Sequence, residues 1–483
     1  MNWINCIKLF AICSVLTSIT NFPSGFTNSS VNTAVLELEK FLKNSYNVRG
    51  IHLSDHTFTL LKSSTLNCWF VAQIFGAIIA PIIPDRYGRK FAYIISTVVM
   101  TFASGLQFIA SMIASPELLI FARALTAFCS PLSDAVLILY LQEVSPPSMR
   151  GMICFLAEIG YSLMCVLGMV LGMRPVFGDS LTRLLGVPIL PMFISIILLL
   201  FLPETPKYLM LVKNNRKAAL KSLNFFQGTH KENENILDDY TAELSDDTSE
   251  GESSMTEIFK TPQLRKAVFL GVCVMVLTLP FYPILQSSTY FLLHAKLSHN
   301  IAEASSTFGF GIFVLACITG TLLIDRYPRR TLILTSGFIT TSSIVAFVTF
   351  STFSHVSELK WAQIGCMSAL LLFLIAFGMV IGPASWFIAP ELVAQRHRAT
   401  VFCICFGINN IFIFLTNFAT LPLYNIIGAY SFLPLFVLPC SLALLFIYLY
   451  LPETLGRETH DIIAEMGNKT HIADIENTLS IKS

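Results

Sequence analysis

The chain has 483 residues, of which 54% are apolar and only 13% are charged, and its formal net charge is +1. An average soluble domain has about 25% charged residues. The composition therefore excludes a soluble enzyme, a disordered chain and, because a basic excess is lacking, a nucleic-acid-binding protein. A polytopic membrane protein remains, and the question is what it moves.

Twelve segments are apolar enough for membrane helices, which need roughly 20 residues each. They predict an all-α membrane protein with twelve transmembrane helices in two six-helix bundles. We expect a bundle at 1–204, a cytosolic linker with short helices at 205–266, a second bundle at 267–451 and a cytosolic tail at 452–483. The predicted spans are 8–28, 63–84, 91–113, 117–140, 152–173, 184–203, 267–293, 305–324, 331–353, 361–390, 400–424 and 429–451.

Basic residues are distributed unevenly between the short loops. The loops after spans two, four, eight and ten contain more arginine and lysine than the opposite short loops, although the first outer loop, 29–62, weakens this bias. Because basic loops stay in the cytosol, both termini are predicted to be cytosolic in a multi-pass plasma-membrane protein.

Residues typical of cofactor or metal sites are not grouped. Nearly all twelve cysteines lie inside spans, where they serve as small packing residues, and the histidines lie in loops, tails or span ends. A Gly-rich phosphate loop and a nucleophile–base pair are both missing. We therefore expect no cofactor, no metal and no enzymatic activity. The sequon at Asn28 lies at the lip of the first span, and we expect it to carry no glycan.

Three charged motifs occur in the same order in both halves. DRYGRK at 85–90 recurs as DRYPRR at 325–330, a Glu…Arg pair at 143 and 150 recurs at 391 and 398, and LPET at 202–205 recurs at 451–454. Such a duplication is typical of transporters, whose solute site lies between the repeats. Acids and arginines at helix ends can form charge-assisted pairs, and such pairs can hold one side of a transporter closed. For the charges of any single loop, the alternative explanation is the general excess of basic residues on the cytosolic side of membrane proteins.

With these motifs the chain resembles the sugar porter family of the major facilitator superfamily, in the style of insect facilitated trehalose transporters. The resemblance also includes YLQEVSPPSMRG at 140–151, PETPKYL at 203–209, GPASW at 382–386 and PETLGR at 452–457. It implies gating by salt bridges among Arg89, Glu143, Arg150 and Glu204 in one half and Arg329, Glu391, Arg398 and Glu453 in the other. Pro328 replaces Gly88 in the second copy, which predicts a differently shaped turn.

The resemblance also implies a substrate site, which departs from the family pattern. In span seven, Pro280 and Phe281 stand where the family has a Gln pair, and Ile284 stands where it has Gly. Pro280 and Pro283 predict a broken helix. The substrate-binding residues predicted by this correspondence are Glu158, Gln286, Tyr290, Trp386, Asn409 and Asn410. For Trp386 packing between the two bundles is the alternative, and for the two asparagines it is bridging between helices.

Two acids lie inside the predicted spans, where charge is costly and points to function. At about 1.5 Å per residue, Asp134 and Glu158 lie about 13 Å and about 10 Å from the cytosolic helix ends. Their similar depth predicts that, if close, one holds a proton. Three roles are open for Glu158: binding a polyol, accepting a proton in coupled transport, or a protonated structural group. A structural role is preferred for Asp134, and Arg123 lies too far along its helix to pair with either acid.

The sequence thus predicts a facilitative transporter of a sugar (trehalose, a hexose or a similar polyol) by alternating access. The first span lacks the acid that proton-coupled members of the resembling family carry, which favours uniport. The alternatives are proton-coupled transport, a non-sugar solute with Glu158 as counter-charge, and a non-transporting sensor. The expected partners are the solute and the lipid bilayer, without nucleic acid, and the protein is expected to be monomeric.

Overall fold

The structure is a computed structural model that divides into two compact units, Met1–Gly251 and Glu252–Ser483. It describes residues 3–80, 82–146, 149–229, 233–238, 240, 255–324, 326–357, 360–394, 397–455, 457, 462 and 465. The division falls within the segment 205–266 that the sequence predicts as a linker. The exact domain boundaries stay a prediction.

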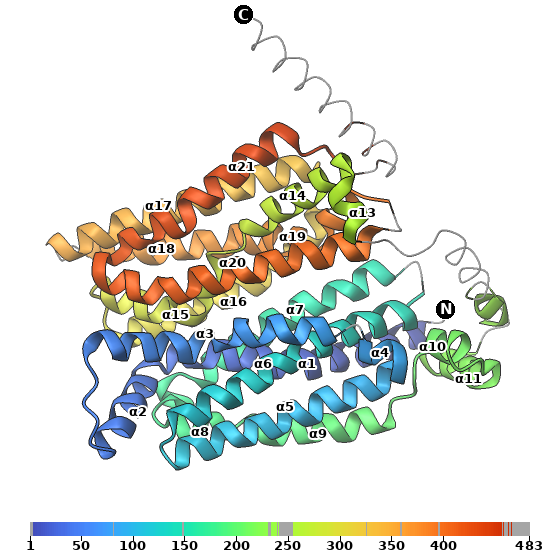
Figure 1. The fold of residues 1–483 in the computed structure, drawn as a ribbon, viewed down its shortest axis with the longest axis horizontal. Helices are drawn as coiled ribbons and strands as arrows, with labels where there is room; N and C mark the ends of the chain where they lie inside the picture. Colours follow the sequence, from blue (N-terminus) through green and yellow to red (C-terminus); the bar gives the residue numbers. More distant parts are fainter. Residues whose placement is uncertain are drawn as a thin grey trace, which may run out of the picture. The chain divides into compact units, whose positions relative to one another are not determined.

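The first unit consists of helices throughout its described part (Figure 1). Its long helices, which are long enough to cross a membrane, are joined by short helices in the loops and in the linker. The helices are α1 (Trp3–Thr33), α2 (Val35–Val48), α3 (Asp55–Ile79), α4 (Ile82–Tyr87), α5 (Arg89–Met112), α6 (Pro116–Val144), α7 (Arg150–Leu171), η1 (Arg174–Gly178), α8 (Leu181–Gly186), α9 (Ile189–Phe201), α10 (Pro206–Leu211) and α11 (Arg216–Gln227).

The second unit repeats this pattern, with short π-helical or 3₁₀ turns that interrupt the spans. Its helices are α13 (Met255–Lys260), α14 (Pro262–Val276), α15 (Phe281–His294), α16 (His299–Leu323), α17 (Arg329–Ser357), α18 (Lys360–Ala376), η2 (Phe377–Ile381), α19 (Gly382–Glu391), α20 (Arg398–Ile427), η4 (Gly428–Ser431), η5 (Leu433–Val437) and α21 (Leu438–Tyr450).

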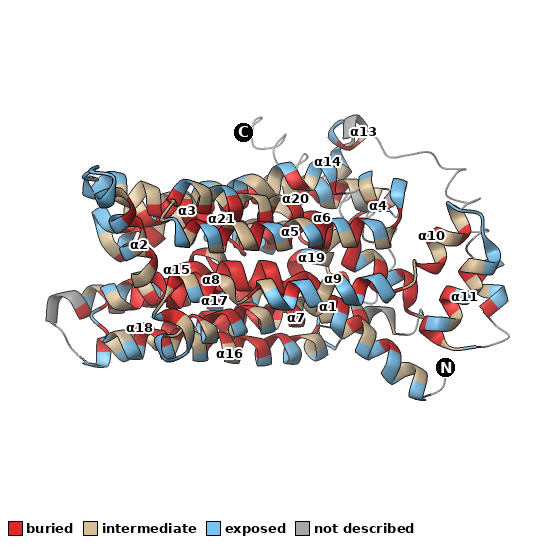
Figure 2. Ribbon diagram, turned by 90° about the horizontal axis from the view of Figure 1, so that it is seen from below, coloured by how far each residue is buried: buried red, intermediate tan, exposed pale blue. Residues whose placement is uncertain are grey.

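The predicted spans are confirmed as helices. Eleven helical stretches in the described residues are long and apolar enough to cross a membrane, and α7 adds the shorter apolar stretch Leu156–Leu171. Large apolar side chains point outward from these helices, among them Phe201 at 80% and Phe338 at 69% exposure. Figure 2 shows buried and exposed residues alternating along the long helices. Outward-facing apolar side chains suit lipid, where water is absent.

The boundaries of the first loop differ from the prediction. Residues 29–62 were expected to form the loop, but α1 continues to Thr33, α2 occupies the middle, and α3 begins at Asp55. The last turn of α1 is polar yet buried, because it packs on α7, where Thr33 donates a hydrogen bond of 2.9 Å to the Met169 carbonyl. Asn28 is only 3% exposed within this helix, so the structure leaves little room for a glycan there.

The two units pack their helices in the same way. In the first unit the pairs α1–α7, α5–α6 and α5–α9 are in contact, and the second unit has the corresponding pairs α14–α20, α17–α18 and α17–α21. Glycines on α7 and at its end allow the close approach to α1. Gly168 of α7 lies against Ser29 and Phe26, and Gly172, directly after α7, lies against Thr33. Small residues are the usual means of such close contacts between membrane helices.

Span seven is broken, as its prolines predict. Pro280 caps the start of α15, four residues after α14 ends at Val276, and Pro283 follows within the first turn of α15. A proline has no N–H to donate to the preceding turn and clashes with it. A second break lies at Ser287, whose backbone angles of φ −143° and ψ 15° are not helical.

Candidate solute site and helix-end charge clusters

The first charge cluster of the first unit joins the start of α5 to the end of α6. The Arg89 Nε atom lies 3.0 Å from the Glu143 Oε1 atom, and both side chains are largely buried, with exposures of 12% and 7%. Arg89 also donates to the Pro84 carbonyl at 3.2 Å. The structure thus brings together two of the four residues that the resemblance assigns to this cluster.

Glu204 lies beside this pair and caps the start of α5. Its carboxylate accepts the backbone N–H of Lys90, at 3.0 and 3.1 Å, and so caps the start of α5. Free N–H groups and the helix dipole favour an anion at this position. Burial raises the pKa of Glu204, and the N–H groups of Thr205 and Lys90 oppose this shift. The described partners of the Glu204 carboxylate are thus backbone N–H groups, and its role in a gating salt bridge stays a prediction.

The second unit repeats both arrangements at the start of α17. Arg329 forms an ion pair with Glu391, and Glu453 accepts the backbone N–H groups of Arg329 and Arg330 at 2.8 and 3.1 Å. The following basic residues also correspond. Lys90 donates to the Leu200 carbonyl at 2.8 Å, and Arg330 donates to the Tyr448 carbonyl at 2.6 Å. The repeated sequence motifs therefore fold into two copies of one structure.

The two remaining predicted gating residues are Arg150 and Arg398, at the starts of α7 and α20. The side chain of Arg150 lies outside the described residues, and Arg398 donates to the Val393 carbonyl at 3.5 Å. The turn before α5 contains Gly88 with φ +105°. Proline cannot adopt this angle because its ring fixes φ near −65°. The turn containing Pro328 is therefore shaped differently, as predicted, although the glutamate cap is kept.

The polar residues inside the first unit take distinct partners. The Asp134 carboxylate accepts a hydrogen bond of 3.2 Å from the Ser130 hydroxyl. Glu158 lies on α7, where it is partly buried, and its closeness to Asp134 stays a prediction. Arg123 is 2% exposed and donates to the carbonyls of Thr65 and Thr27, both at 3.0 Å. Arg123 thus ties α6 to α3 and α1.

In the second unit, three of the predicted amides are buried. Gln286, Asn409 and Asn410 are 4%, 5% and 3% exposed. Asn409 Nδ2 lies 3.5 Å from the Thr278 hydroxyl at the break between α14 and α15, which is the bridging that was the alternative role. Its Oδ1 atom and the Asn410 Nδ2 atom have no hydrogen-bond partner among the described residues. Buried polar atoms are normally paired, so these two have capacity left for a ligand.

Aromatic residues surround this part of α20. Trp386 is 43% exposed, and its ring packs on Phe402 and Phe406 of α20 at 6.0 and 5.7 Å. Residues three and four positions apart share a helix face, so Phe406 lies on the same face as Asn409 and Asn410. Phe281, where the resembling family has an amide, instead stacks on Phe377 at 4.5 Å with an interplanar angle of 5°. Tyr290 donates to Asn425 Oδ1 at 2.6 Å.

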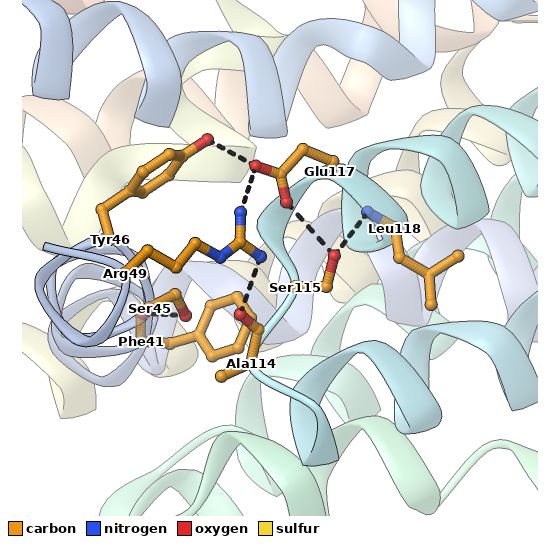
Figure 3. A network of polar contacts seen from close by, with 8 residues as sticks. All are labelled: Phe41, Ser45, Tyr46, Arg49, Ala114, Ser115, Glu117 and Leu118. Atoms are coloured by element: carbon orange, nitrogen blue, oxygen red, sulfur yellow. Dashed lines mark hydrogen bonds and ion pairs between the residues drawn. The ribbon is translucent and has the colours of Figure 1, made fainter. Parts of the chain in front are cut away.

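A further polar network, which sequence reasoning missed, connects α2 to the turn before α6 (Figure 3). Glu117 accepts hydrogen bonds from Arg49 at 2.7 Å, Tyr46 at 2.9 Å and Ser115 at 3.2 Å. Arg49 also donates to the Ala114 carbonyl at 3.3 Å. Burial and the adjacent carboxylate raise the pKa of Tyr46, so it remains a donor at neutral pH. The only sequence signal was an acid in the first turn of α6.

The residues that the structure describes contain no group of three histidine, cysteine or acidic side chains that could hold a metal ion. The arrangement instead offers amides, a half-exposed indole ring and paired helix-end charges. A membrane protein of two equivalent helical units with duplicated charge clusters is a transporter of the major facilitator type. Its sequence matches the profile of the "Sugar (and other) transporter" family over residues 11–465, and the chain belongs to that family.

Several known proteins are similar to this chain. The human "Solute carrier family 2, facilitated glucose transporter member 7" is 26% identical over 449 residues, which cover 90% of this chain and 85% of that protein. The rat "facilitated glucose transporter member 5" is 23% identical over 488 residues, covering 97% and 94%. The inward open xylose transporter XylE from E. coli has a TM-score of 0.75 at 14% identity and covers 95% of this chain and 99% of its own. This last likeness concerns the fold.

Proposed function

We propose that the protein is a facilitative transporter that carries a sugar across the plasma membrane by alternating access, with both termini in the cytosol. It acts without a cofactor, as a monomer, and not as an enzyme. The solute is trehalose, a hexose or a similar polyol. The sugar specificity of the curated relatives supports the class of solute, and their names point to glucose among the hexoses.

The observation that carries this proposal is the pair of buried amides on α20. The Asn409 oxygen and the Asn410 nitrogen are unpaired among the described residues, and together they provide an acceptor and a donor. Sugar hydroxyls both donate and accept hydrogen bonds, so they match such a pair. The Trp386 ring offers an apolar face to the C–H groups of a sugar ring. Glu158, Gln286 and Tyr290 complete the proposed binding residues.

The test is uptake of radiolabelled trehalose, glucose and several polyols in oocytes, at two external pH values. We expect uptake of at least one sugar, independent of the proton gradient. Replacing Asn409 or Asn410 by Ala is expected to raise KM about tenfold, since a hydrogen bond to a neutral group that is lost in a buried site costs about 1–3 kcal/mol. Asn44→Ala on the exposed face of α2 is the matched control. Absence of uptake of every sugar would contradict the proposal and favour a sensor.

Glu158 separates the remaining alternatives. In a sugar uniporter, Glu158→Gln keeps an oxygen acceptor and is expected to retain uptake. If the solute is cationic, the same variant removes the counter-charge and uptake collapses. If Glu158 accepts a proton in coupled transport, wild-type uptake follows the proton gradient and the variant loses that dependence. Measuring both proteins at both pH values distinguishes the three cases.

A further inference from the structure

The linker helix α11 has one face that packs inside the first unit. Leu223 and Phe226 are 0% exposed, and the Gln227 side chain donates a hydrogen bond of 3.0 Å to the Val144 carbonyl at the end of α6. Figure 1 shows α11 close to the N-terminal end of the chain, and α11 contacts α1. The apolar face of α11 is therefore occupied by its own unit, and the opposite face is left for a partner.

The opposite face of α11 is basic. Lys217 and Lys221 are both exposed, and because they are four residues apart they lie on the same side of the helix. Neither lysine has an acidic partner in the part of the chain that the structure describes, whereas the adjacent Arg216 is paired with Asp238. We call Lys217 and Lys221 the lysine stripe of α11. It carries two positive charges that the first unit leaves uncompensated.

The lysine stripe ends beside the cytosolic end of α1. Phe225, 39% exposed, follows four residues after Lys221 on the same side of α11. The Lys8 side chain donates to the Phe225 carbonyl at 2.8 Å, and its ammonium group lies 4.2 Å from the centre of the Phe225 ring. Lys8 of α1 and Phe225 of α11 thus join the basic face of the linker helix to the first membrane helix.

The side of α1 that carries Lys8 is apolar and faces outward. Ile4, one turn before Lys8 on the same side, is 74% exposed, and Trp3 beside it is 78% exposed. Tryptophan is enriched where membrane helices meet the lipid headgroups. The contact between Lys8 and Phe225 therefore places the end of the lysine stripe at the level of the headgroups.

The distances along α11 keep both lysines within reach of a charged headgroup. Lys221 lies one helical turn from Phe225 and Lys217 lies two turns from it, about 6 Å and about 12 Å along the axis. Attraction between lysines and an anionic leaflet falls off within a Debye length, which is about 10 Å at 0.1 M salt. The long lysine side chains shorten these distances further, so both charges act on a phosphate group near Phe225.

We propose that the lysine stripe, together with Lys8, binds the headgroups of anionic phospholipids and holds α11 against the surface of the bilayer. Lipid is the partner because the basic face continues into the outward-facing apolar side of α1. The competing partner is the acidic segment 238–252 of this chain, which is rich in Asp and Glu. The assignment to the cytosolic leaflet rests on the proposed orientation, whereas the binding itself does not depend on transport.

The test is photo-crosslinking of the full-length protein in nanodiscs of phosphatidylcholine that contain a minor fraction of phosphatidylserine. A benzophenone-bearing amino acid replaces Phe225, and mass spectrometry identifies the lipid adducts. The ratio of phosphatidylserine to phosphatidylcholine adducts is expected to exceed the ratio in the bilayer about fivefold to 25-fold, since each lysine near the surface contributes about fivefold. At 1 M salt, where the Debye length is about 3 Å, this excess should largely disappear.

Variants and a control position connect the excess to the lysines. Lys217→Gln combined with Lys221→Gln should lower the adduct ratio nearly to that of the bilayer, whereas Lys217→Arg combined with Lys221→Arg keeps both charges and should retain the excess. The control places the same photoreactive amino acid at Phe102, which is 62% exposed in the middle of α5. Adducts there should follow the composition of the bilayer in every variant.

Three results would overturn the proposal. The first is an adduct ratio at position 225 equal to that at position 102, and the second is an excess that the two glutamines leave unchanged, since other basic residues would then attract the lipid. The third is crosslinking of position 225 to peptides of the segment 238–252 in place of lipid, which would assign the lysine stripe to that segment. These measurements need no transported solute, so their failure would leave the proposed transport function untouched.

Discussion

The duplicated ion pairs give a prediction in which the two copies serve as each other's reference. Glu143→Gln and Glu391→Gln each remove one carboxylate charge and keep a carbonyl oxygen at the same place. In the first copy, the arginine and the carboxylate are 12% and 7% exposed. In the second copy, they are 16% and 29% exposed. The acid of the first pair is thus shielded from solvent much more than the acid of the second.

The burial of each ion pair decides how much stability is lost when its carboxylate is removed. Removing one partner of a fully buried pair costs about 3–5 kcal/mol because an unpaired charge remains, whereas exposed pairs are worth about 0–1 kcal/mol. Arg89 keeps its bond to the Pro84 carbonyl, and glutamine still accepts a hydrogen bond. We therefore expect Glu143→Gln to lower the free energy of unfolding by about 2–3 kcal/mol and Glu391→Gln to lower it by about 1 kcal/mol.

Thermal unfolding in detergent measures the difference. For units of this size, about 1 kcal/mol corresponds to roughly 2–4 °C in Tm, so Glu143→Gln should lower Tm by about 4–12 °C and Glu391→Gln by about 2–4 °C. Combining Glu143→Gln with Arg89→Met should cost less than the sum of the two single changes, because both remove the same pair. Equal losses in the two copies, or additive losses at Arg89 and Glu143, would refute the reasoning from burial.

Three further predictions concern the ends of the helices in the first unit. Gly88→Ala should lower the free energy of unfolding by about 1–3 kcal/mol, because φ is positive at this residue and a Cβ atom would meet the Glu204 carboxylate and the Tyr208 ring. The control is Gly105→Ala, where a Cβ atom meets open space. It should be neutral or stabilising in the same Tm measurement. Arg49→Ala should leave Tm nearly unchanged, because Arg49 and Glu117 are 37% and 54% exposed and exposed ion pairs contribute little to stability. A loss of Tm that persists at 1 M salt, where the Debye length is about 3 Å, would speak against an ion-pair effect. The stability of Glu204→Gln relative to wild type should increase over the pH range above the ordinary glutamate pKa of about 4.3. Burial raises the folded pKa of Glu204, so the unfolded chain ionises first and rising pH favours unfolding of the wild type only; a Tm difference that stays constant over this range would contradict the shift.

The charge clusters show how far motif reasoning reached. The recurrence of DRYGRK and its partner motifs predicted which helix ends carry charge and that both halves carry the same set. The pairs Arg89–Glu143 and Arg329–Glu391 are ion pairs in the structure. Glu204 and Glu453 were expected to join these pairs; their described contacts are with backbone N–H groups at the start of the next helix, which no motif indicated. A motif indicates that a carboxylate lies near the start of the next helix. Which N–H group donates to this carboxylate depends on the path of the turn that precedes that helix.

Polar contacts between distant segments were beyond the sequence. Tyr290 and Asn425 are 135 residues apart, and Arg49 and Glu117 are 68 residues apart. Each of these residues alone is an ordinary polar side chain at a helix end. Only the packing of α15 on α20, and of α2 against the turn before α6, brings them within hydrogen-bond distance.

Hydropathy and charge by themselves determined the twelve spans, the duplication and the break in span seven. These features follow from local rules: a span must be apolar over its length to lie in lipid, and proline disrupts a helix wherever it occurs inside one. The tertiary structure decided where each polar group finds its partner, which includes the bridging contact of Asn409, the hydrogen bond between Tyr290 and Asn425 and the caps at Glu204 and Glu453. A buried polar group must be paired, but its partner is set by which helices pack together and at what depth, and this is a property of the whole fold.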